Sequence, residues 1–450
     1  MDRAFLSFSI KTSSYCVCDL FNCRTESVLR IYTHSREDVK VVEKLTDHQN
    51  FTSLDFWRMP HDLNDSADVM VSDSHLTALK QHLNMAGFRY KMKIEDVGKI
   101  IRKEWRTVRR RQRSVRRRKR YVAKPFYDFL NYQPYSNMIR YLMDVSIRYP
   151  HITKLQEIGR SREQRTIYLL QIGTKNNANK PAIWVDSGVH AREWAAPHAA
   201  FFMINQLVTK YGKDAEITKM VDRLDWYFAP HLNPDGYTFS WTNPSPYVRL
   251  WRKNRAPDQC MYWIGTRMCC IGVDLNRNFD AQWARHGLTE NNPCKHIYHG
   301  VAAFSEPESR AVRDFVRPRL HKIKAFLTLH TFSQLWLHSW GYYSGSYPPD
   351  FFDLQRVGTQ AAQAIRSVHG IRFRVGSMPD FYYTASGSSK DWAKQQGIKY
   401  AYTIELRPDK DINDYTGFML DTRQLLPAAQ ETWQGVKVVA RTVLHEFGTL

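Results

Sequence analysis

The chain has 450 residues, of which 43% are hydrophobic and 13 are Trp, so it is long enough for two or three domains with sizeable cores. Its formal net charge of +21 would by itself suggest nucleic acid or an anionic membrane as a partner. However, twelve Lys or Arg and one acid fall between Arg102 and Arg120, so 11 of the 21 excess charges (12 − 1) lie in one segment. The remainder is only moderately basic, and no apolar run is long enough to span a membrane.

Cysteine positions indicate the compartment. Four of the seven fall close together in the C-terminal half: Cys260, Cys269, Cys270 and Cys294. This clustering is typical of two local disulfides in an oxidising compartment, and the alternative of a Cys-only zinc site lacks a C-x-x-C pair. Asn50 and Asn64 each begin an N-glycosylation acceptor. We therefore expect a secreted protein, although Ala4–Ile10 is a short apolar run that makes no convincing signal peptide.

The N-terminal part predicts a small domain after a leader. Residues 1–27 contain Cys16, Cys18 and Cys23 and show little periodicity. From residue 28 the pattern predicts, in chain order, strand Val28–Tyr32, helix Glu37–Leu45, strands Leu54–Trp57 and Ala67–Val71, helix Ser74–Met85 and strand Phe88–Ile94. The order βαββαβ is typical of the split-βαβ arrangement, so we expect an α+β domain over residues 28–103.

A basic run, Arg109–Arg120, follows this domain. Its charges would repel one another on a helix, so the sequence predicts an exposed, mobile linker over residues 104–120. A solvated charge run and a nucleic-acid or nuclear-localisation patch are two interpretations, but neither aromatic interleaving nor a DNA-binding motif accompanies it. The third is cleavage after Arg120 by a dibasic-specific processing protease, which needs an accessible extended segment. We favour processing because the run separates two compact domains, and we expect no nucleic-acid partner.

The remaining residues, 121–450, alternate between helices and strands. We expect helices at Asn137–Arg148, Ala195–Lys210, Glu306–Val316, Phe352–His369 and Glu431–Phe447, and strands at Thr166–Ile172, Ala182–Val185, Asp225–His231, Ile323–Thr328 and Gly397–Glu405. This alternation predicts an α/β domain with a mixed, mostly parallel sheet flanked by helices, in which ligands bind at the carboxyl ends of the strands.

Candidate metal ligands follow the strand Ala182–Val185. His190 and Glu193 are three residues apart, so on a helical turn they face the same way and supply two ligands of a His₂Glu zinc site. The spacing alone is weak evidence, because His34 and Glu37 repeat it in the N-terminal domain. There Ser35 and Asp38 instead predict a capping box that begins a surface helix.

Two further residues distinguish the copy at His190. His330 ends the apolar strand that begins at Ile323, which makes it the candidate third ligand. Glu405 closes another apolar strand, where a carboxylate must either find a partner, such as Arg407, or take part in chemistry.

With these residues the chain resembles the zinc metallocarboxypeptidases, most closely the pancreatic carboxypeptidase A/B type. The motifs that carry the resemblance occur in the order of that family: His190-Ala-Arg-Glu193, Asn233-Pro-Asp-Gly236, Leu250-Trp-Arg-Lys253, Gly272-Val-Asp-Leu-Asn-Arg-Asn278, His330-Thr-Phe-Ser-Gln334, Tyr383-Thr-Ala-Ser-Gly387, Asp391-Trp392 and Glu405-Leu-Arg407. They span nearly all of residues 121–450. The N-terminal domain resembles the activation (pro) domain of the same family, through Val28-Leu-Arg-Ile31, Leu54-Asp-Phe-Trp-Arg58 and Ile94-Glu-Asp-Val97.

The resemblance implies a role for each matching residue. One zinc ion per chain would be held by His190, Glu193 and His330. Glu405 would be the general base and Arg252 would stabilise the oxyanion. The carboxylate of the substrate C-terminus would be bound by Asn276, Arg277 and Tyr383. Outer positions of the substrate groove would be formed by Arg192, Arg249 and Phe418, with surface ion pairs as the alternative for the arginines.

Several positions depart from the family pattern or extend it. Phe332 stands where a Tyr is common. The resemblance implies a disulfide between Cys270 and Cys294; Cys260 and Cys269 are additional and are expected to pair with each other, although four cysteines allow three connectivities. The resemblance implies that Lys390 lies at the base of the pocket for the departing side chain, which favours an acidic C-terminal residue unless Lys390 turns outward or pairs with Asp391.

The sequence thus predicts a secreted, monomeric proenzyme that acts on peptide and protein C-termini and is weakly active until a processing protease cuts it. A-type specificity for apolar C-terminal residues is the alternative. Other rivals are a catalytically weak peptide-binding relative, which would be expected to lack a ligand or the base, and an amidase, which would not need the carboxylate clamp.

Overall fold

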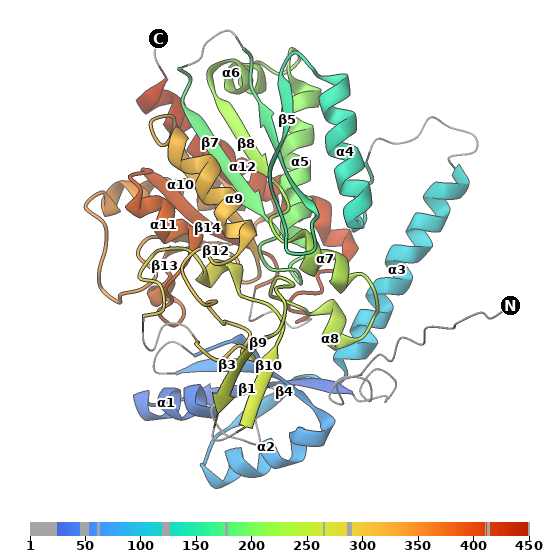
Figure 1. The fold of residues 1–450 in the computed structure, drawn as a ribbon, viewed down its shortest axis with the longest axis vertical. Coiled ribbons are helices and arrows are strands. Elements are labelled where there is room, and N and C mark those ends of the chain that lie inside the picture. Colours follow the sequence, from blue (N-terminus) through green and yellow to red (C-terminus); the bar gives the residue numbers. More distant parts are fainter. Residues whose placement is uncertain are drawn as a thin grey trace, which may run out of the picture.

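A computed structural model describes residues 25–45, 54–60, 64–118, 127–175, 179–263, 266–285, 290–409, 411 and 415–448. They form an N-terminal domain, described up to residue 118, and a C-terminal domain, described from residue 127 (Figure 1). In Figure 1 the N-terminal domain lies against one end of the C-terminal domain. The leader cysteines, Asn50 and the proposed cleavage residue Arg120 fall outside the described residues.

The N-terminal domain has the predicted βαββαβ order. Its strands and helices are β1 (Glu26–Thr33), α1 (Arg36–Lys44), β2 (Asp55–Arg58), β3 (Asp65–Ser72), α2 (Asp73–Met85) and β4 (Tyr90–Ile94). The strand order is β2-β3-β1-β4 and each pair is antiparallel. Strand residues alternate between faces, so Leu29 and Ile31 pack with the helix residue Leu79, while Val28 joins the core of the C-terminal domain. One face of this sheet therefore closes its own core and the other contacts the C-terminal domain.

Helix α3 (Val97–Arg118) contradicts the linker expected over residues 104–120, because the basic run is helical as far as the structure describes it. The buried residues Val97, Ile101, Trp105 and Val108 recur every three or four positions and form an apolar stripe against the C-terminal domain. Tertiary packing of this stripe outweighs the repulsion between the arginines, which lie mostly on the exposed side over residues 102–113. Figure 1 shows α3 running from the N-terminal domain along the side of the C-terminal domain.

An eight-stranded sheet organises the C-terminal domain. Its strands are β5 (Thr153–Arg160), β6 (Thr166–Ile172), β7 (Ala182–Ser187), β8 (Asp225–Ala229), β11 (Ile323–Thr331), β12 (Leu335–His338), β13 (Arg374–Ser377) and β14 (Tyr400–Leu406). Their order is β13-β12-β14-β11-β7-β8-β6-β5. The central strands β14, β11, β7 and β8 are parallel, whereas β12 pairs antiparallel with β14, and β6 does so with β8 and β5. This mixed, mostly parallel sheet confirms the predicted fold class.

Helices cover both faces of the sheet. They are α4 (Tyr135–Arg148), α5 (Ala195–Lys210), α6 (Ala215–Arg223), α7 (Pro234–Ser240), α8 (Pro246–Arg249), α9 (Pro307–Val316), α10 (Phe351–His369), α11 (Ser389–Gln395) and α12 (Leu425–Phe447). Along β7, Ile183 and Val185 pack on the side of α5 and α12, while Ala182 and Trp184 pack on the side of α9 and α11. A strand buried on both faces reads as a continuous apolar run, which is why β7 could be predicted.

A two-stranded hairpin, β9 (Gln259–Trp263) and β10 (Thr266–Cys270), lies outside the main sheet. Cys260 and Cys269 face each other across it and form one disulfide, and Cys270 forms the other with Cys294. Both predicted pairings are therefore confirmed. No helix within the described ranges combines the length and apolar character needed to cross a membrane.

The fold places three of the predicted site residues at one edge of the sheet. His190 follows the end of β7, His330 lies next to the last residue of β11, and Glu405 lies next to the last residue of β14. Because β11 and β14 are parallel and in register, His330 and Glu405 are direct neighbours across the two strands. The carboxyl ends of parallel strands thus bring together side chains that are far apart in the sequence.

Candidate active site

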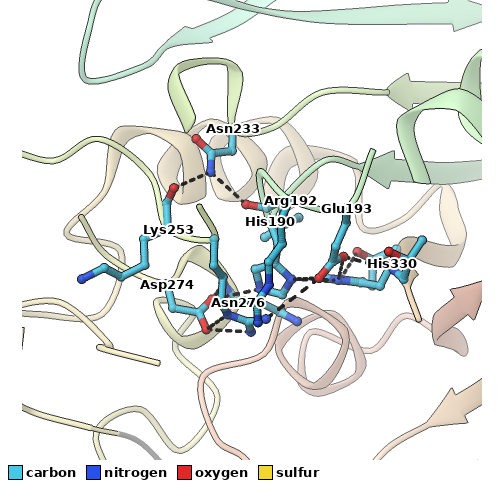
Figure 2. A network of polar contacts seen from close by, with 12 residues as sticks. His190, Arg192, Glu193, Asn233, Lys253, Asp274, Asn276 and His330 are labelled. Carbon is cyan, nitrogen blue, oxygen red and sulfur yellow. Dashed lines mark hydrogen bonds and ion pairs between the residues drawn. The ribbon is translucent and has the colours of Figure 1, made fainter. Parts of the chain in front are cut away.

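His190, Glu193 and His330 form the buried group in the described residues that could hold a metal ion, with all three candidate ligand atoms within 4.8 Å of one another. Nδ1 of His190 lies 2.7 Å from Oε1 of Glu193, and Nδ1 of His330 lies 3.0 Å from Oε2 of Glu193. The two Nδ1 atoms are 3.2 Å apart. Figure 2 shows the three side chains pointing toward one another.

Hydrogen bonds behind the two imidazoles indicate which nitrogen carries the proton. Nε2 of His190 lies 3.0 Å from Oδ1 of Asp274, a carboxylate that can only accept. Nε2 of His330 lies 3.2 Å from the hydroxyl of Thr328, whose own proton is donated to Asp186 at 2.7 Å. Both Nε2 atoms therefore carry hydrogen, so both Nδ1 lone pairs face the carboxylate of Glu193. Two imidazole lone pairs and a carboxylate at this spacing can bind one cation together. Asp274 and Thr328 hold the two imidazole rings in the orientation that this requires.

The electrostatics of Glu193 and His190 agree with a cation site, whereas His330 responds chiefly to the neighbouring carboxylate. Burial alone would raise the pKa of Glu193, but His190 and His330 hold it well below its usual range, so it stays an anion. Burial lowers the pKa of His190, which favours the neutral ring that a metal needs. Burial acts the same way on His330, but the Glu193 carboxylate outweighs it and raises the pKa of that ring.

Glu405 lies beside this group, next to His330 across the two parallel strands. Its Oε2 atom is buried and has no hydrogen bond to any described residue. Burial raises the pKa of the Glu405 carboxyl, and the nearby Glu193 acts in the same direction. The salt bridge with Arg407 that the sequence left open does not form, because Arg407 donates two hydrogen bonds to Glu431 instead, at 2.7 and 2.5 Å. Glu405 is thus a carboxylate that can exchange a proton.

Arg252 is fixed close to the candidate ligands. Its Nε and Nη2 atoms donate to Oδ2 of Asp274 at 3.0 and 2.8 Å, and Nη1 is 3.9 Å from Oε1 of Glu193. Burial alone would raise the pKa of Asp274, but Arg252 and His190 keep it well below its usual range. Asp274 therefore orients both the ring of His190 (Figure 2) and the guanidinium of Arg252.

The structure brings together the three residues predicted to bind a terminal carboxylate, Asn276, Arg277 and Tyr383, at one cavity. Nη2 of Arg277 donates to the hydroxyl of Tyr383 at 2.9 Å, and Nη1 donates to the main-chain oxygen of Asn276 at 2.9 Å. Nε of Arg277 is buried and has no hydrogen-bond partner among the described residues. The side-chain oxygen of Asn276 accepts from the main-chain amide of Ser389 at 2.9 Å. Because this bond uses the oxygen, the side-chain NH₂ group of Asn276 remains as a donor. Three donor side chains thus meet where a terminal carboxylate can bind.

Lys390 lines the same cavity and is paired. Its ammonium donates to Oδ1 of Asp391 at 2.5 Å and to the main-chain oxygen of His338 at 3.0 Å, and the side chain is only 3% exposed. Burial lowers the pKa of Lys390, and Asp391 opposes this. The other carboxylate oxygen of Asp391 accepts from the amide of Gly341 and the hydroxyl of Ser388. The pairing that the sequence offered as an alternative is therefore present.

One cavity of about 790 Å³ joins these groups. The predicted site residues that line it are His190, Arg192, Glu193, Arg252, Asn276, Arg277, His330, Tyr383, Lys390, Glu405 and Phe418. Arg249 is not among its lining residues; it is fully buried behind Arg192 and donates to the main-chain oxygen of Arg192 at 2.9 Å. A surface ion pair is therefore excluded for Arg249.

Comparison with known proteins agrees with this geometry. Residues 138–435 match the model of the zinc carboxypeptidase family, and residues 29–104 match that of the carboxypeptidase activation peptide. The chain belongs to the zinc carboxypeptidase family. It is 36% identical to carboxypeptidase A1 of Bos taurus over 93% of this chain and 94% of that protein. It is 40% identical to carboxypeptidase B of Astacus astacus over 71% of this chain and 99% of that protein.

A solved structure of carboxypeptidase A from Helicoverpa armigera is similar as well, with a TM-score of 0.82 and 28% identity over 95% of this chain and 99% of that one. As a zinc carboxypeptidase of the A/B type, the protein is a zinc-dependent metallo-exopeptidase made as a proenzyme. Its N-terminal domain is the activation domain.

The activation domain of this carboxypeptidase reaches the site through residues that sequence reasoning had not assigned. Asp55 accepts a hydrogen bond from Nη1 of Arg192 at 2.7 Å, and Glu104 accepts two from Arg249, at 2.7 and 3.1 Å. The ring of Trp57 meets that of Phe418 edge-on, with 5.5 Å between the ring centroids. The sequence carried no signal for these contacts, because Asp55 and Glu104 are charged residues whose burial depends on the other domain.

The second copy of the His-x-x-Glu spacing has the structural role predicted for it. Ser35 and Asp38 form the capping box of α1, and the amide of His34 donates to Asp38 at 2.7 Å. Asp274 was also missed as a functional residue, although it lies inside a motif of the family. Its only signal was its position two residues before Asn276 of the clamp.

Proposed function

We propose that His190, Glu193 and His330 hold the zinc ion of this carboxypeptidase and that Glu405 and Arg252 act on the last peptide bond of the substrate. The convergence of two imidazole lone pairs and a carboxylate, beside a carboxylate without a partner, carries this proposal. Zinc in this position would supply Lewis-acid chemistry, polarising the carbonyl and lowering the pKa of water.

The protein's own residues account for the remaining steps. Glu405, which can exchange a proton, takes one from the attacking water and passes it to the leaving amine. Arg252 is held rigidly by Asp274 and presents a fixed cation to the oxygen on which negative charge develops. Arg277, Tyr383 and Asn276 bind the terminal carboxylate, which an internal peptide bond does not have. The enzyme therefore removes single residues from the C-terminus.

Lys390 supports a preference for acidic C-terminal residues. Two of its three N–H donors are occupied by Asp391 and His338, which leaves one for a substrate carboxylate. An apolar side chain would leave that buried donor unpaired. The competing argument is that the Lys390–Asp391 pair is already neutral, so the pocket would accept apolar residues as A-type enzymes do.

A panel of peptides that differ only in the last residue separates these two specificities. Glu and Gln have the same shape, so their comparison isolates the charge; we expect Glu to be released roughly 10- to 100-fold faster, the range for a hydrogen bond to a charged group. Faster release of Phe or Leu than of Glu would establish the apolar alternative. The proposed site is supported if a chelator abolishes release, zinc restores it, and the Glu405→Gln variant has lost it. A Glu405→Gln variant with unchanged turnover excludes the site.

The processing and location of the enzyme complete the proposal. A dibasic-specific protease cuts after Arg120 in the connector, and the mature product acts outside the cell as a monomer. Two disulfides in the C-terminal domain support an oxidising compartment. Mass spectrometry of the mature protein tests the cleavage; an N-terminus far from Tyr121 would contradict it.

A further inference from the structure

Helix α3 carries a row of exposed basic side chains along one side. The row consists of Lys103, Arg106, Arg110 and Arg113, and we call it the basic row. Its spacing of three, four and three residues keeps all four positions on one stripe of the helix, because 3.6 residues make a turn. At 1.5 Å per residue the basic row is about 15 Å long.

Packing on the other side of the helix holds the basic row in place. The buried stripe that begins at Val97 and ends at Val108 lies roughly half a turn around the helix axis from it, at about 100° per residue. The main-chain oxygen of Val108 also accepts from Asn131 of the C-terminal domain at 3.1 Å. In Figure 1, α3 lies at the outer side of the molecule, with no other described helix or strand beyond it. The helix is therefore ordered before a ligand arrives, which lowers the entropy cost of binding.

The basic row has no acidic partners in the described part of the chain. Glu104 is the only acid in α3, and it pairs with Arg249 on the buried side at 2.7 Å. The charge of Lys103 acts on Asp421, but that carboxylate already accepts from Arg423 at 2.9 Å. The ion pairs that α3 forms on its exposed side involve other arginines, namely Arg102 with Asp96 and Arg111 with Asp128. Four like charges thus stand in a row without neutralisation by a described residue.

This charge is local and not a property of the whole protein. Residues 102–120 carry a net charge of +11 (12 − 1), whereas the remaining 431 residues (450 − 19) together carry only +10 (21 − 11). A small anion would meet one or two of these cations. A polymer with repeated anionic groups can contact the whole basic row at once and so gains from every charge. The ligand that fits this surface is therefore a polyanion.

Three observations favour a sulfated polysaccharide among the polyanions. The apolar side of α3, which a membrane-bound helix would insert into the bilayer, is buried against the C-terminal domain. The basic row contains no aromatic side chain on which nucleic-acid bases could stack, and the single aromatic residue of α3, Trp105, is buried. The two disulfides indicate an oxidising compartment, and sulfated polysaccharides are the abundant polyanions outside cells.

We propose that the basic row of α3 binds a sulfated polysaccharide, whose sulfate groups accept hydrogen bonds from the guanidinium groups of Arg106, Arg110 and Arg113. The surface belongs to the activation domain and leaves with it. The polysaccharide thus retains the uncut proenzyme and releases the mature enzyme. Binding is independent of the proposed function, whereas release rests on the proposed cleavage after Arg120.

The test measures the Kd of the uncut proenzyme for heparin by surface plasmon resonance at about 0.15 M NaCl. The variant Arg106→Gln/Arg110→Gln/Arg113→Gln should bind about 10- to 100-fold more weakly, at roughly 2- to 5-fold for each exposed charge pair. Its Kd should also rise less steeply with NaCl concentration than that of the wild type. The matched control is Lys210→Gln/Lys213→Gln/Lys219→Gln, which removes the same charge at exposed positions on and between α5 and α6 and should change the Kd less than twofold.

The identity of the polymer is tested on the same uncut protein. Heparin from which the sulfate groups have been removed should bind at least tenfold more weakly than heparin. Tighter binding of single-stranded DNA of equal length, or of phosphatidylserine vesicles, would overturn the inference and assign the basic row to that ligand. An equal loss of heparin binding in the two triple variants would also overturn it, because attraction would then follow net charge alone. So would an unchanged Kd in the Arg106→Gln/Arg110→Gln/Arg113→Gln variant.

Release is tested on an immobilised heparin column. The mature enzyme, separated from its activation domain, should elute at a lower NaCl concentration than the uncut proenzyme. Elution of both at the same concentration would contradict the release step. Peptide hydrolysis by the mature enzyme, measured in parallel, reports on the proposed function and does not depend on any of these binding results.

Discussion

The pair between Asp55 and Arg192 predicts how strongly the activation domain holds the site closed. We consider Asp55→Asn in the uncut proenzyme. Both side chains of the pair are 2% exposed, and breaking a buried pair by removing one charge typically costs about 3–5 kcal/mol. The Asn side-chain oxygen can still accept from Arg192, so we take a value just below this range, about 2–3 kcal/mol. At 1.4 kcal/mol per factor of ten, the open population rises roughly 30- to 150-fold.

The assay is the hydrolysis rate of a small peptide by uncut protein, with intactness verified by gel electrophoresis before and after. The variant should gain activity by the calculated factor, up to the rate of the mature enzyme. Glu37→Gln is the matched control, because Glu37 pairs with Lys40 on the exposed side of α1 at 3.5 Å, and its loss should change nothing. Uncut Asp55→Asn protein with the same basal rate as wild type would refute the assignment of Asp55 as a restraint on the site.

Two further predictions concern the C-terminal domain. Glu405→Gln in the mature enzyme should lower kcat about 100- to 10,000-fold, the usual contribution of a general base, while the zinc content measured by atomic absorption stays at one per chain. Burial lowers the pKa of His198 to about 4 and that of His231 to about 3, so both are neutral in the folded state while the unfolded chain takes up protons below pH about 6.5. Stability should therefore be retained above pH 6.5 and fall by up to about 1.4 kcal/mol per pH unit for each ring as the pH drops toward 4; His198→Phe should make the fall in Tm shallower, and an unchanged slope would contradict this cause.

Helices and strands whose burial produces a recognisable local pattern of apolar residues could be predicted from the sequence. The strand at Ala182 reads as a continuous apolar run because helices cover both of its faces, and the helix Ala195–Lys210 has the bounds predicted for it. The four-residue strands β12 and β13 show no readable period and were not predicted. His330 and Glu405 could be found because each ends an apolar strand, and the parallel sheet aligns such ends.

Features that depend on distant partners could not be predicted. The basic helix α3 was expected to be irregular, because the sequence shows its charges but not the surface that buries Trp105 and Val108. Asp55 and Glu104 meet their arginines across 137 and 145 residues, and nothing local to either carboxylate indicates a partner. Lys390 could be placed in the pocket by resemblance and its pairing with the adjacent Asp391 was one of the orientations considered, but the sequence alone could not decide between them.

Cleavage at the basic connector breaks one covalent bond and none of the contacts that cover the site. After the cut, Glu104 still pairs with Arg249, and Arg111 still pairs with Asp128 at 2.8 Å. Val108 remains buried, and its main-chain oxygen still accepts from Asn131 at 3.1 Å. If the enzyme is processed there, we expect activity to require two steps, cleavage and then dissociation of the activation domain.

This sequence of steps predicts a lag between cleavage and activity, which a time course can measure by following the cut on a gel and peptide hydrolysis in the same sample. Glu104→Gln should shorten the lag at least tenfold, because loss of one partner of a buried charge pair acts mainly on the dissociation rate. Glu157→Gln, which removes an exposed partner of Arg160, is the control and should keep the wild-type lag. Activity that rises in step with cleavage in the wild-type protein would show that the contacts of α3 do not hold the cut domain in place.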